Sequence, residues 1–383
     1  MLLLLSFEGR SQASLDSVIA VVRSENKELI ASRLQMEAEM KEARTGIYLP
    51  NPEVQFDYLW GDPASSGNRT DFGISQSFSF PSIYVQKSNQ KGLVSSNASL
   101  SYIQKEREVI QKAKMTWINQ VGINRQLKLI DQRVKLAEEI SMKAKIQLSR
   151  GEIDIIRYHH AQMEYVNLKM ERAMLDVELN SLQTRLVQLC GGRSVKVTDT
   201  TYPILSTWSE SELLGSLAGT PWIKSRENEI NIRNLDKNIA VSEWLPKFKA
   251  GYYSETVSGL KYQGITTGIS IPLFQNSNSV KTAELRTKTA TAELDQFRSH
   301  RTAAIRSLLA KREKLSAQVR EIESALLPVN DVSLLKKALD AGEINISEFY
   351  YECSVFYTAW SNLIASEEEL ALTETELLYV AGR

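Results

Sequence analysis

Few side chains in this sequence have the type and spacing needed for metal or acid–base chemistry. His159 and His160, beside Tyr158, are the strongest candidates, because neutral imidazoles bind transition metals. On a helix, adjacent side chains point about 100° apart, whereas two ligands of one ion stand four residues apart. We therefore expect structural or surface histidines and no metal site.

Cys190 and Cys353 are the only thiols in the chain. Two isolated cysteines provide neither a disulfide framework nor zinc-ligand spacing, so we expect both to be core residues. The sequence shows no Ser/His/Asp arrangement, no glycine-rich phosphate loop and no HExxH motif. These observations predict a protein that is not an enzyme and uses no cofactor.

Charge and hydropathy narrow the class of protein further. The 46 basic and 46 acidic residues cancel, so no general attraction to nucleic acid is expected. No window approaches the roughly 18 apolar residues of a membrane-spanning helix. The apolar start, followed by Ser11-Gln12-Ala13, predicts that residues 1–13 are a signal-peptide remnant or a disordered start.

A duplicated phrase organises the rest of the chain. Gly-Glu-Ile-Asp-Ile at 151–155 returns as Gly-Glu-Ile-Asn-Ile at 342–346, 191 residues later. Pro81 and Pro272 are related by the same offset. Each phrase interrupts a long proline-poor helical pattern, which predicts a tight turn between two antiparallel helices. The chain is therefore expected to be an internal repeat.

The first repeat is expected to cover residues 14–205. Helix-forming composition begins near Leu15 and continues to about Ala43. The elements predicted after it are a β-hairpin at 52–81, a long helix at 82–150 and a return helix at 155–190. At about 1.5 Å per residue the long helix spans roughly 100 Å, which indicates an elongated coiled-coil body.

The second repeat, 206–383, is expected to follow the same plan. It opens with a helix, and breaks or kinks are expected at Pro221 and Pro328, because proline disrupts a helix interior. The further elements predicted are a β-hairpin at 246–272, a long helix at 273–341 and a return helix at 345–381.

The hairpins alternate between apolar and polar residues with a period of two, which is typical of strands with two unlike faces. Because four such strands recur at paired positions beside helices that leave little to cover them, we interpret the apolar face as lipid-facing. The aromatic residues are interpreted as a girdle at the lipid interface; a small hydrophobic core is the alternative. The lipid-facing residues predicted are Val54, Phe56, Tyr58, Trp60, Phe72, Ile74, Phe78, Phe80, Phe248, Tyr252, Ile265, Ile269 and Ile271.

Four strands cannot close a barrel, for which about eight are needed. An open sheet edge in lipid would leave backbone groups without hydrogen-bond partners. If the strands span a membrane, the protein must therefore be a homo-oligomer whose copies share one barrel. The expected fold class is an α+β membrane protein with a helical coiled-coil barrel and four transmembrane strands per chain.

From about residue 14 to 383 the pattern resembles the TolC-like outer-membrane efflux channels. The residues that carry the resemblance are Leu49-Pro50 and Leu245-Pro246 before the hairpins, Pro81 and Pro272 after them, and the two glycine turns. The Asn51-Pro52-Glu53 strand start is similar to the heavy-metal efflux branch. The sequence has no cysteine near its start and departs there from the lipidated members of the family.

The resemblance implies a homotrimer with a shared twelve-stranded barrel in outer-membrane lipid and a helical barrel in the periplasm. It implies a passive conduit that exports small molecules or metal ions. The implied partners are a periplasmic adaptor (membrane fusion) protein and an inner-membrane pump of the RND type. A belt of short segments is implied at about Gly192–Trp222.

In the family the glycine turns are the periplasmic tips, where the adaptor docks and the channel is gated. Adaptor docking is thereby implied for Arg150, Gly151, Glu152, Ala341, Gly342 and Glu343. The gate candidates implied are Ile156, Arg157, Ser347, Glu348 and Tyr351. Tyr351 replaces an aspartate that the family pattern would place there, which weakens the case for a second acidic ring.

We hypothesise that Arg157 and Glu348 pair between neighbouring coils and hold the tip closed. The alternative is a solvated pair, worth about 0–1 kcal/mol, or no pair. For the whole protein, the alternative function is a coiled-coil scaffold or partner-binding protein without channel activity. That alternative explains the helices but leaves the four alternating strands unexplained.

Overall fold

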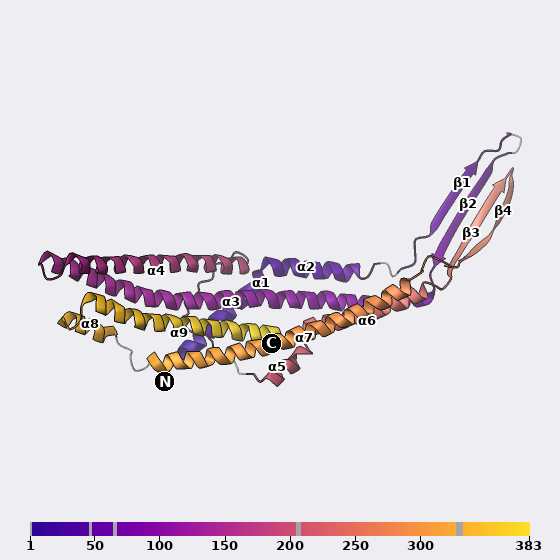
Figure 1. Ribbon diagram of the computed structural model, residues 1–383. Coiled ribbons are helices and arrows are strands. Elements are labelled where there is room, and N and C mark those ends of the chain that lie inside the picture. The colour runs from indigo at the N-terminus through magenta and orange to yellow at the C-terminus, as the bar shows by residue number, and fades with distance from the viewer. Residues whose placement is uncertain (1, 46–47, 64–66, 204–207, 327–331) are drawn as a thin grey trace. The chain divides into compact units, whose positions relative to one another are not determined.

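The computed structural model describes residues 2–45, 48–63, 67–203, 208–326 and 332–383, and the chain divides into two compact units (Figure 1). The helical unit consists of Met1–Ala31, Lys105–Ala218 and Arg301–Arg383. The sheet unit consists of Ser32–Gln104 and Gly219–His300. Each repeat therefore contributes to both units, and neither unit is one repeat.

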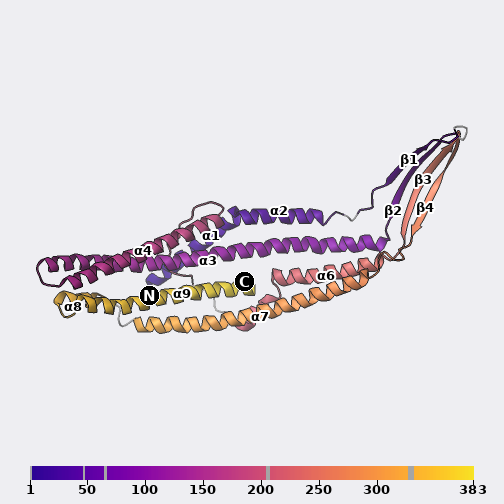
Figure 2. The same ribbon diagram turned by 45° about the horizontal axis from the view of Figure 1, so that its top comes forward.

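The sheet unit contains an antiparallel sheet with the strand order β1-β2-β3-β4 (Figures 1 and 2). The strands are β1 (Glu53–Leu59), β2 (Arg69–Phe78), β3 (Lys247–Val257) and β4 (Leu260–Ser270). The first repeat supplies the β1–β2 hairpin and the second supplies the β3–β4 hairpin. The β2–β3 ladder, which sets Phe78 opposite Phe248, joins the two repeats in one sheet.

The β3–β4 hairpin has a two-residue loop whose backbone fixes its register. Ser258 and Gly259 have φ values of 47° and 87°. Positive φ at both positions is the conformation of the tight turns whose twist matches antiparallel strands. Val257 therefore pairs with Leu260, and the alternation of the two strands stays in phase.

Three helices of the sheet unit adjoin the strands along the chain. They are α6 (Pro221–Ser242), the first part of α3 (Pro81–Ser149) and the first part of α7 (Ser279–Leu326). α2 (Lys27–Glu42) also lies mostly in this unit. The break expected at Pro221 is present, because Thr220 caps α6 and the proline occupies its first turn.

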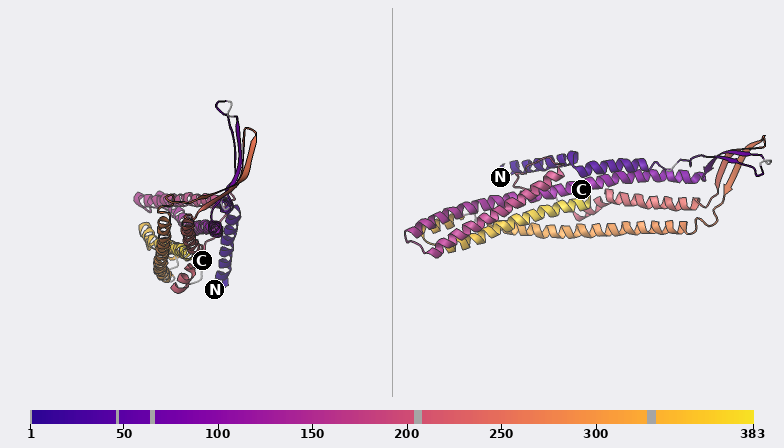
Figure 3. Two further views of the ribbon diagram at one scale, coloured as in Figure 1. Left: turned by 90° about the vertical axis from the view of Figure 1, so that its right-hand side faces the viewer. Right: turned by 90° about the horizontal axis from the view of Figure 1, so that it is seen from above.

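The helical unit contains the rest of α3 and α7 and five further helices. These are α1 (Leu2–Glu25), α4 (Ile155–Leu189), α5 (Glu210–Leu217), α8 (Val332–Ala341) and α9 (Ile346–Ala381). α4 and α9 both lie along α3, as Figures 2 and 3 show. The largest fully buried side chains of this unit are Trp117 on α3 and Phe349 on α9.

Two helices that the sequence predicts as continuous are divided. The N-terminal helix ends at Glu25, and Asn26 begins the next one by accepting a hydrogen bond from the Leu29 backbone N–H at 3.0 Å. The buried Asn26 amide also donates to the Leu189 carbonyl oxygen at 2.7 Å, which fixes the break. The long helix expected at 273–341 is divided into α7 and α8, and Pro328 lies outside the described residues.

The predicted combination of long helices with a small antiparallel sheet is confirmed. Membrane insertion and the trimeric barrel remain predictions. Within the described ranges, no helix is both long enough and apolar enough to cross a bilayer.

Candidate functional site

The two glycine turns have the same backbone geometry. Gly151 and Gly342 have φ values of 72° and 77°, a left-handed conformation that favours glycine. In the first turn the Glu152 N–H donates to the Gln147 carbonyl at 2.9 Å, and the Gly151 N–H donates to the Leu148 carbonyl at 3.0 Å. The second turn repeats this Schellman pattern with the same offset. α3 and α8 therefore end in the same hydrogen-bonded turn.

Side-chain caps then start both return helices. Asp154 accepts a hydrogen bond from the Arg157 backbone N–H at 2.8 Å. Asn345, its counterpart 191 residues later, accepts from the backbone N–H groups of Ser347 and Glu348. The Glu348 carboxylate accepts from the Asn345 backbone N–H at 2.9 Å and completes a capping box. The N-terminus of α9 is therefore held by more side-chain hydrogen bonds than the N-terminus of α4.

Direct contacts join the two turns within the helical unit. The Ser347 hydroxyl lies 3.1 Å from the His160 Nδ1, and the His160 and Tyr350 rings meet edge to face at 5.9 Å. Lys143 pairs with Asp340 at 2.7 Å. The two turns therefore form one surface of the unit, here called the tip surface (150–160 and 340–351).

An ion pair beside the tip surface links α3 to α8. Lys336 Nζ lies 2.5 Å from Glu139 Oε2. This hydrogen bond lowers the pKa of Glu139 and raises the pKa of Lys336, so both groups carry charge at neutral pH.

The residues with an implied docking role are all exposed on the tip surface. They are Arg150, Gly151, Glu152, Ala341, Gly342 and Glu343. Arg150 Nη1 lies 3.8 Å from Glu152 Oε1, and the two side chains are 67% and 48% exposed. The exposed part of the tip surface therefore carries charged side chains.

The gate candidates are exposed as well, and Ile156 and Tyr351 are 76% and 68% exposed. The structure does not bring Arg157 and Glu348 together. Arg157 lies 3.5 Å from Asp154, and Glu348 is held by the Asn345 capping box. Within this chain both charges therefore serve the starts of their own helices. Ser347 is exposed beside Glu348 and contacts His160.

The buried cysteines lie on different helices, Cys353 on α9 and Cys190 at the end of α4. Burial raises the pKa of the Cys353 thiol to about 12 and also raises the pKa of Cys190. Both are therefore protonated core side chains at neutral pH.

On the sheet, the predicted lipid-facing residues align across the strands. Val54 pairs with Ile74, Ile74 with Tyr252, and Tyr252 with Ile265. A second row joins Phe78, Phe248 and Ile269. These side chains form one apolar face, and every predicted member except the half-buried Phe78 is exposed.

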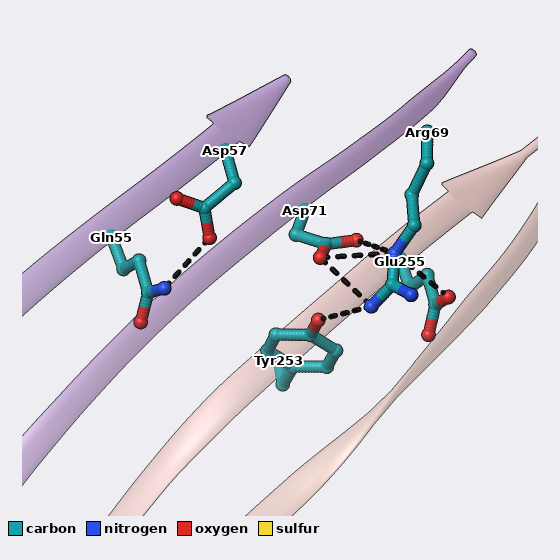
Figure 4. Close-up of polar contacts among 6 residues, drawn as sticks. All are labelled: Gln55, Asp57, Arg69, Asp71, Tyr253 and Glu255. Carbon is teal, nitrogen blue, oxygen red and sulfur yellow. Dashed lines mark hydrogen bonds and ion pairs between the residues drawn. The ribbon is translucent and has the colours of Figure 1, made fainter. Parts of the chain in front are cut away.

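The alternate residues form a polar row on three strands, which Figure 4 shows in close-up. Asp57 on β1, Asp71 on β2 and Glu255 on β3 stand opposite one another. Arg69 pairs with Asp71 at 2.9 Å and with Glu255 at 3.1 Å. Its guanidinium also donates to the Tyr253 hydroxyl at 3.3 Å, so one cation joins side chains of β2 and β3, while Asp57 accepts from the Gln55 amide at 2.7 Å.

Alternation alone places Asp57 and Asp71 on one face of the first hairpin. It does not identify the Arg69 cluster, because Tyr253 and Glu255 come from the other repeat. Only the β2–β3 register, with Asp71 opposite Glu255, brings these residues together. Comparison of the two repeats gives no signal either, because Arg69 and Asp71 correspond to Leu260 and Tyr262 at the 191-residue offset.

No protein-family model and no curated protein matches the sequence. Solved structures do match in three dimensions. CusC, whose crystal structures concern transmembrane channel formation, superposes with a TM-score of 0.79 at 15% identity, covering 97% of this chain and 92% of that chain. The Campylobacter jejuni outer-membrane channel CmeC superposes with a TM-score of 0.80 at 14% identity, covering 96% of this chain and 85% of that chain. The outer-membrane protein VceC of Vibrio cholerae superposes with a TM-score of 0.81 at 12% identity, and the match covers 97% of each chain.

The matches extend over nearly the whole chain. At this level of identity they establish the fold. The chain therefore has the fold of the TolC-like outer-membrane channels.

Proposed function

We propose that the protein is the outer-membrane component of a tripartite efflux system and a passive conduit from the periplasm to the outside. The observation that carries this proposal is the two-faced sheet. One face is a continuous set of exposed aromatic and aliphatic side chains. The other carries Arg69 with its partners Asp71, Tyr253 and Glu255, here called the Arg69 row. Lipid on one side and water on the other account for both faces.

The sheet is incomplete in one chain. β1 and β4 are its outer strands, and within the described residues each pairs with only one other strand. Joining the β4 edge of one copy to the β1 edge of the next satisfies both edges, and three copies give the twelve strands of a closed barrel. We therefore propose a homotrimer in outer-membrane lipid, with the Arg69 row facing the lumen.

We place adaptor docking and gating at the tip surface. Its two turns are rigid, exposed and charged, and three copies would present six turns in a ring. Arg150, Glu152 and Glu343 would meet the periplasmic adaptor, which in turn contacts an inner-membrane pump of the RND type. Ile156 and Tyr351 would narrow the closed opening, because both are large apolar side chains left uncovered in the single chain.

Conductance and assembly in detergent test the proposal together. We expect purified outer membranes to contain the protein as a heat-resistant trimer, and the trimer to open ion-conducting channels in planar bilayers. A monomer or dimer that opens no channel would contradict the proposal and favour the coiled-coil scaffold.

The gate is tested separately on the same trimer. Tyr351→Ala is expected to raise the closed-state conductance, and Ser354→Ala, one turn along α9 and also exposed, is the matched control. Equal leak through both variants would remove Tyr351 from the gate and leave the channel proposal intact.

A further inference from the structure

A pocket of about 260 Å³ in the helical unit is lined by positive charge. Helix α3 contributes Arg107 and Lys114, α1 contributes Arg23, and Arg383 follows α9. The other described residues of the wall are neutral, so no acidic side chain among them lines this space. We call the space between these four cations the basic pocket.

Packed helices position three of the four cations. Arg107 and Lys114 are seven residues apart, which places them on one side of α3. Ala113, beside Lys114, and Val22, beside Arg23, are fully buried in one core cluster that also includes a residue of α9. The backbone around the basic pocket is therefore held by close packing of three helices.

Contacts within the chain orient two of the arginines. Arg23 Nε lies 2.9 Å from Glu106 Oε1, and the Arg107 guanidinium donates to the Gly382 carbonyl oxygen at 2.7 Å. A guanidinium group has five N–H donors, so the contact with Glu106 leaves further donors of Arg23 for a ligand. The Arg23 side chain is 60% exposed, which keeps these donors accessible from solvent.

Helix α9 adds a hydroxyl group to the wall, and Arg383 adds a cation. Thr375 lines the pocket and is 7% exposed, whereas Glu374, the residue before it, pairs with Arg312 at 2.7 Å. The Arg383 guanidinium stacks over the Trp208 ring at 3.9 Å. This part of α9 therefore turns its polar neutral side chain toward the pocket and pairs its carboxylate with another helix.

Lys114 has no hydrogen-bonded counter-ion among the described residues, and it is half-buried. Burial lowers the pKa of its ammonium group, the charge of Asp16 opposes this shift, and the charge of Arg23 adds to it. A cation that is partly removed from water and lies near another cation is stabilised by a bound anion. The surroundings of Lys114 thus favour an anionic ligand.

We propose that the basic pocket binds a phosphate group, carried either by a free phosphate or by a lipid head group. The pocket shares no residue with the tip surface or with the sheet. The inference therefore goes beyond the proposed conduit and does not depend on it.

The charge and the size of the pocket favour phosphate over other anions. A phosphate monoester carries about −1.5 to −2 charges at pH 7 and has three strong acceptor oxygens. Two guanidinium groups and one ammonium group match these acceptors, whereas a carboxylate binds a single guanidinium in its bidentate geometry. A water molecule occupies about 30 Å³ in the liquid, so the pocket has room for a phosphate group together with ordered waters.

Calorimetric titration with inorganic phosphate gives the first test. The full chain, purified in nonionic detergent without phosphate, is expected to bind one phosphate per chain, and Lys114→Met is expected to raise the Kd at least tenfold. Lys112→Met is the matched control, because Lys112 lies on the same helix, pairs with Glu108 at 2.6 Å and does not line the pocket. Equal phosphate Kd values for Lys114→Met and the wild-type chain would overturn the location of the site.

A second variant and a second anion make the test independent of folding. Arg23→Gln is expected to weaken phosphate binding at least fivefold, and circular dichroism should retain its helical signal because the side chain is mostly exposed. Acetate at the same ionic strength is expected to compete poorly. Acetate that binds as tightly as phosphate would overturn the choice of phosphate.

Lipids distinguish the two sources of the phosphate group. If a lipid supplies it, native mass spectrometry from mixed micelles should show the wild-type chain retaining phosphatidate at least tenfold better than Lys114→Met, with phosphatidylcholine retained equally by both. If free phosphate is the ligand, inorganic phosphate binds and retention of neither lipid depends on Lys114. A wild-type chain that binds neither inorganic phosphate nor phosphatidate would overturn the proposal.

Discussion

The two return helices begin with the same turn and have different surroundings. Ile155, the first residue of α4, is 50% exposed, whereas its counterpart Ile346 on α9 is 7% exposed. Four residues in from its cap, α4 has the half-buried Tyr158 and α9 has the fully buried Phe349. Duplication has thus preserved the turn while one copy became a core element and the other a surface element.

The difference extends along both helices. α9 contacts α3 and α8 and is buried at more positions than α4, whose Met163, Met170 and Met174 stay exposed. The comparison teaches that the turn geometry follows from local sequence, whereas the role of each helix depends on what lies beside it. Four pairs of substitutions test this distinction.

The largest effect is expected at the paired aromatic positions. Phe349→Ala should lower the free energy of unfolding by about 3–5 kcal/mol, because it leaves a cavity in a fully buried site. Tyr158→Ala should lower it by much less, since that ring is half-buried. Denaturant unfolding of the two variants measures the contrast. Similar losses would mean that the two return helices are equally embedded.

A pH-dependent effect is expected at Glu368, whose counterpart on α4 is Val177. Burial, together with the neighbouring carboxylates Glu178 and Glu369, raises the pKa of Glu368 to about 7. The folded state therefore holds this proton more tightly than the unfolded chain, so the stabilisation is full below about pH 4.5 and is lost as pH rises through 7.

Glu368→Gln is accordingly expected to stabilise the protein by roughly 2 kcal/mol at pH 8 and by little at pH 5. Thermal melts at both pH values measure this. Glu369→Gln is the control, because Glu369 forms an exposed ion pair with Lys311 and should show no such gain at pH 8. A change in stability of Glu368→Gln that is the same at both pH values would contradict the raised pKa of Glu368.

The caps should respond unequally. Asn345→Ala removes the acceptor of two backbone N–H groups and breaks a capping box, so a loss of about 1–2 kcal/mol is expected. Asp154→Ala removes the acceptor of one backbone N–H group, and we expect about half that loss of stability. Hydrogen exchange of the first turn of each helix measures the difference between the two caps. Equal protection in the two variants would contradict the stronger cap at Asn345.

Substitution of the two turn glycines, Gly151 and Gly342, should lower the free energy of unfolding equally. This is the smallest of the four expected effects. Gly151→Ala and Gly342→Ala meet no neighbouring atoms, so each should cost only the left-handed backbone strain of about 1 kcal/mol. Matched shifts in the unfolding midpoint would confirm that the turn itself is the same in both repeats. A much larger loss at one glycine would show that its turn also supports the surrounding packing.

Local patterns in the sequence were sufficient to predict both glycine turns and both hairpins. The turns depend on a glycine followed by a capping residue, and the hairpins depend on strict alternation with nearby prolines. The strands and the return helices therefore lie within a few residues of their predicted bounds.

The rest depends on contacts between distant segments. The break at Asn26 is fixed by the carbonyl of Leu189, and the Arg69 cluster requires the other repeat. The helix caps that hold Arg157 and Glu348 within one chain were not part of the sequence-based hypothesis, and pairing of these residues between neighbouring coils stays a prediction. The fully buried position of Phe349 could not be inferred from its neighbours along the chain, because Tyr158 follows an almost identical phrase.

The β2–β3 ladder also determines the order in which the sheet can form. Arg69 and Tyr253, which meet across it, are 184 residues apart, whereas each hairpin closes between neighbours along the chain. Local hairpins form within microseconds, and contacts of high sequence separation come later. A chain of which only the first repeat has been synthesised therefore presents β2 as an open edge. Until β3 arrives, that edge can pair with the same edge of another unfinished chain.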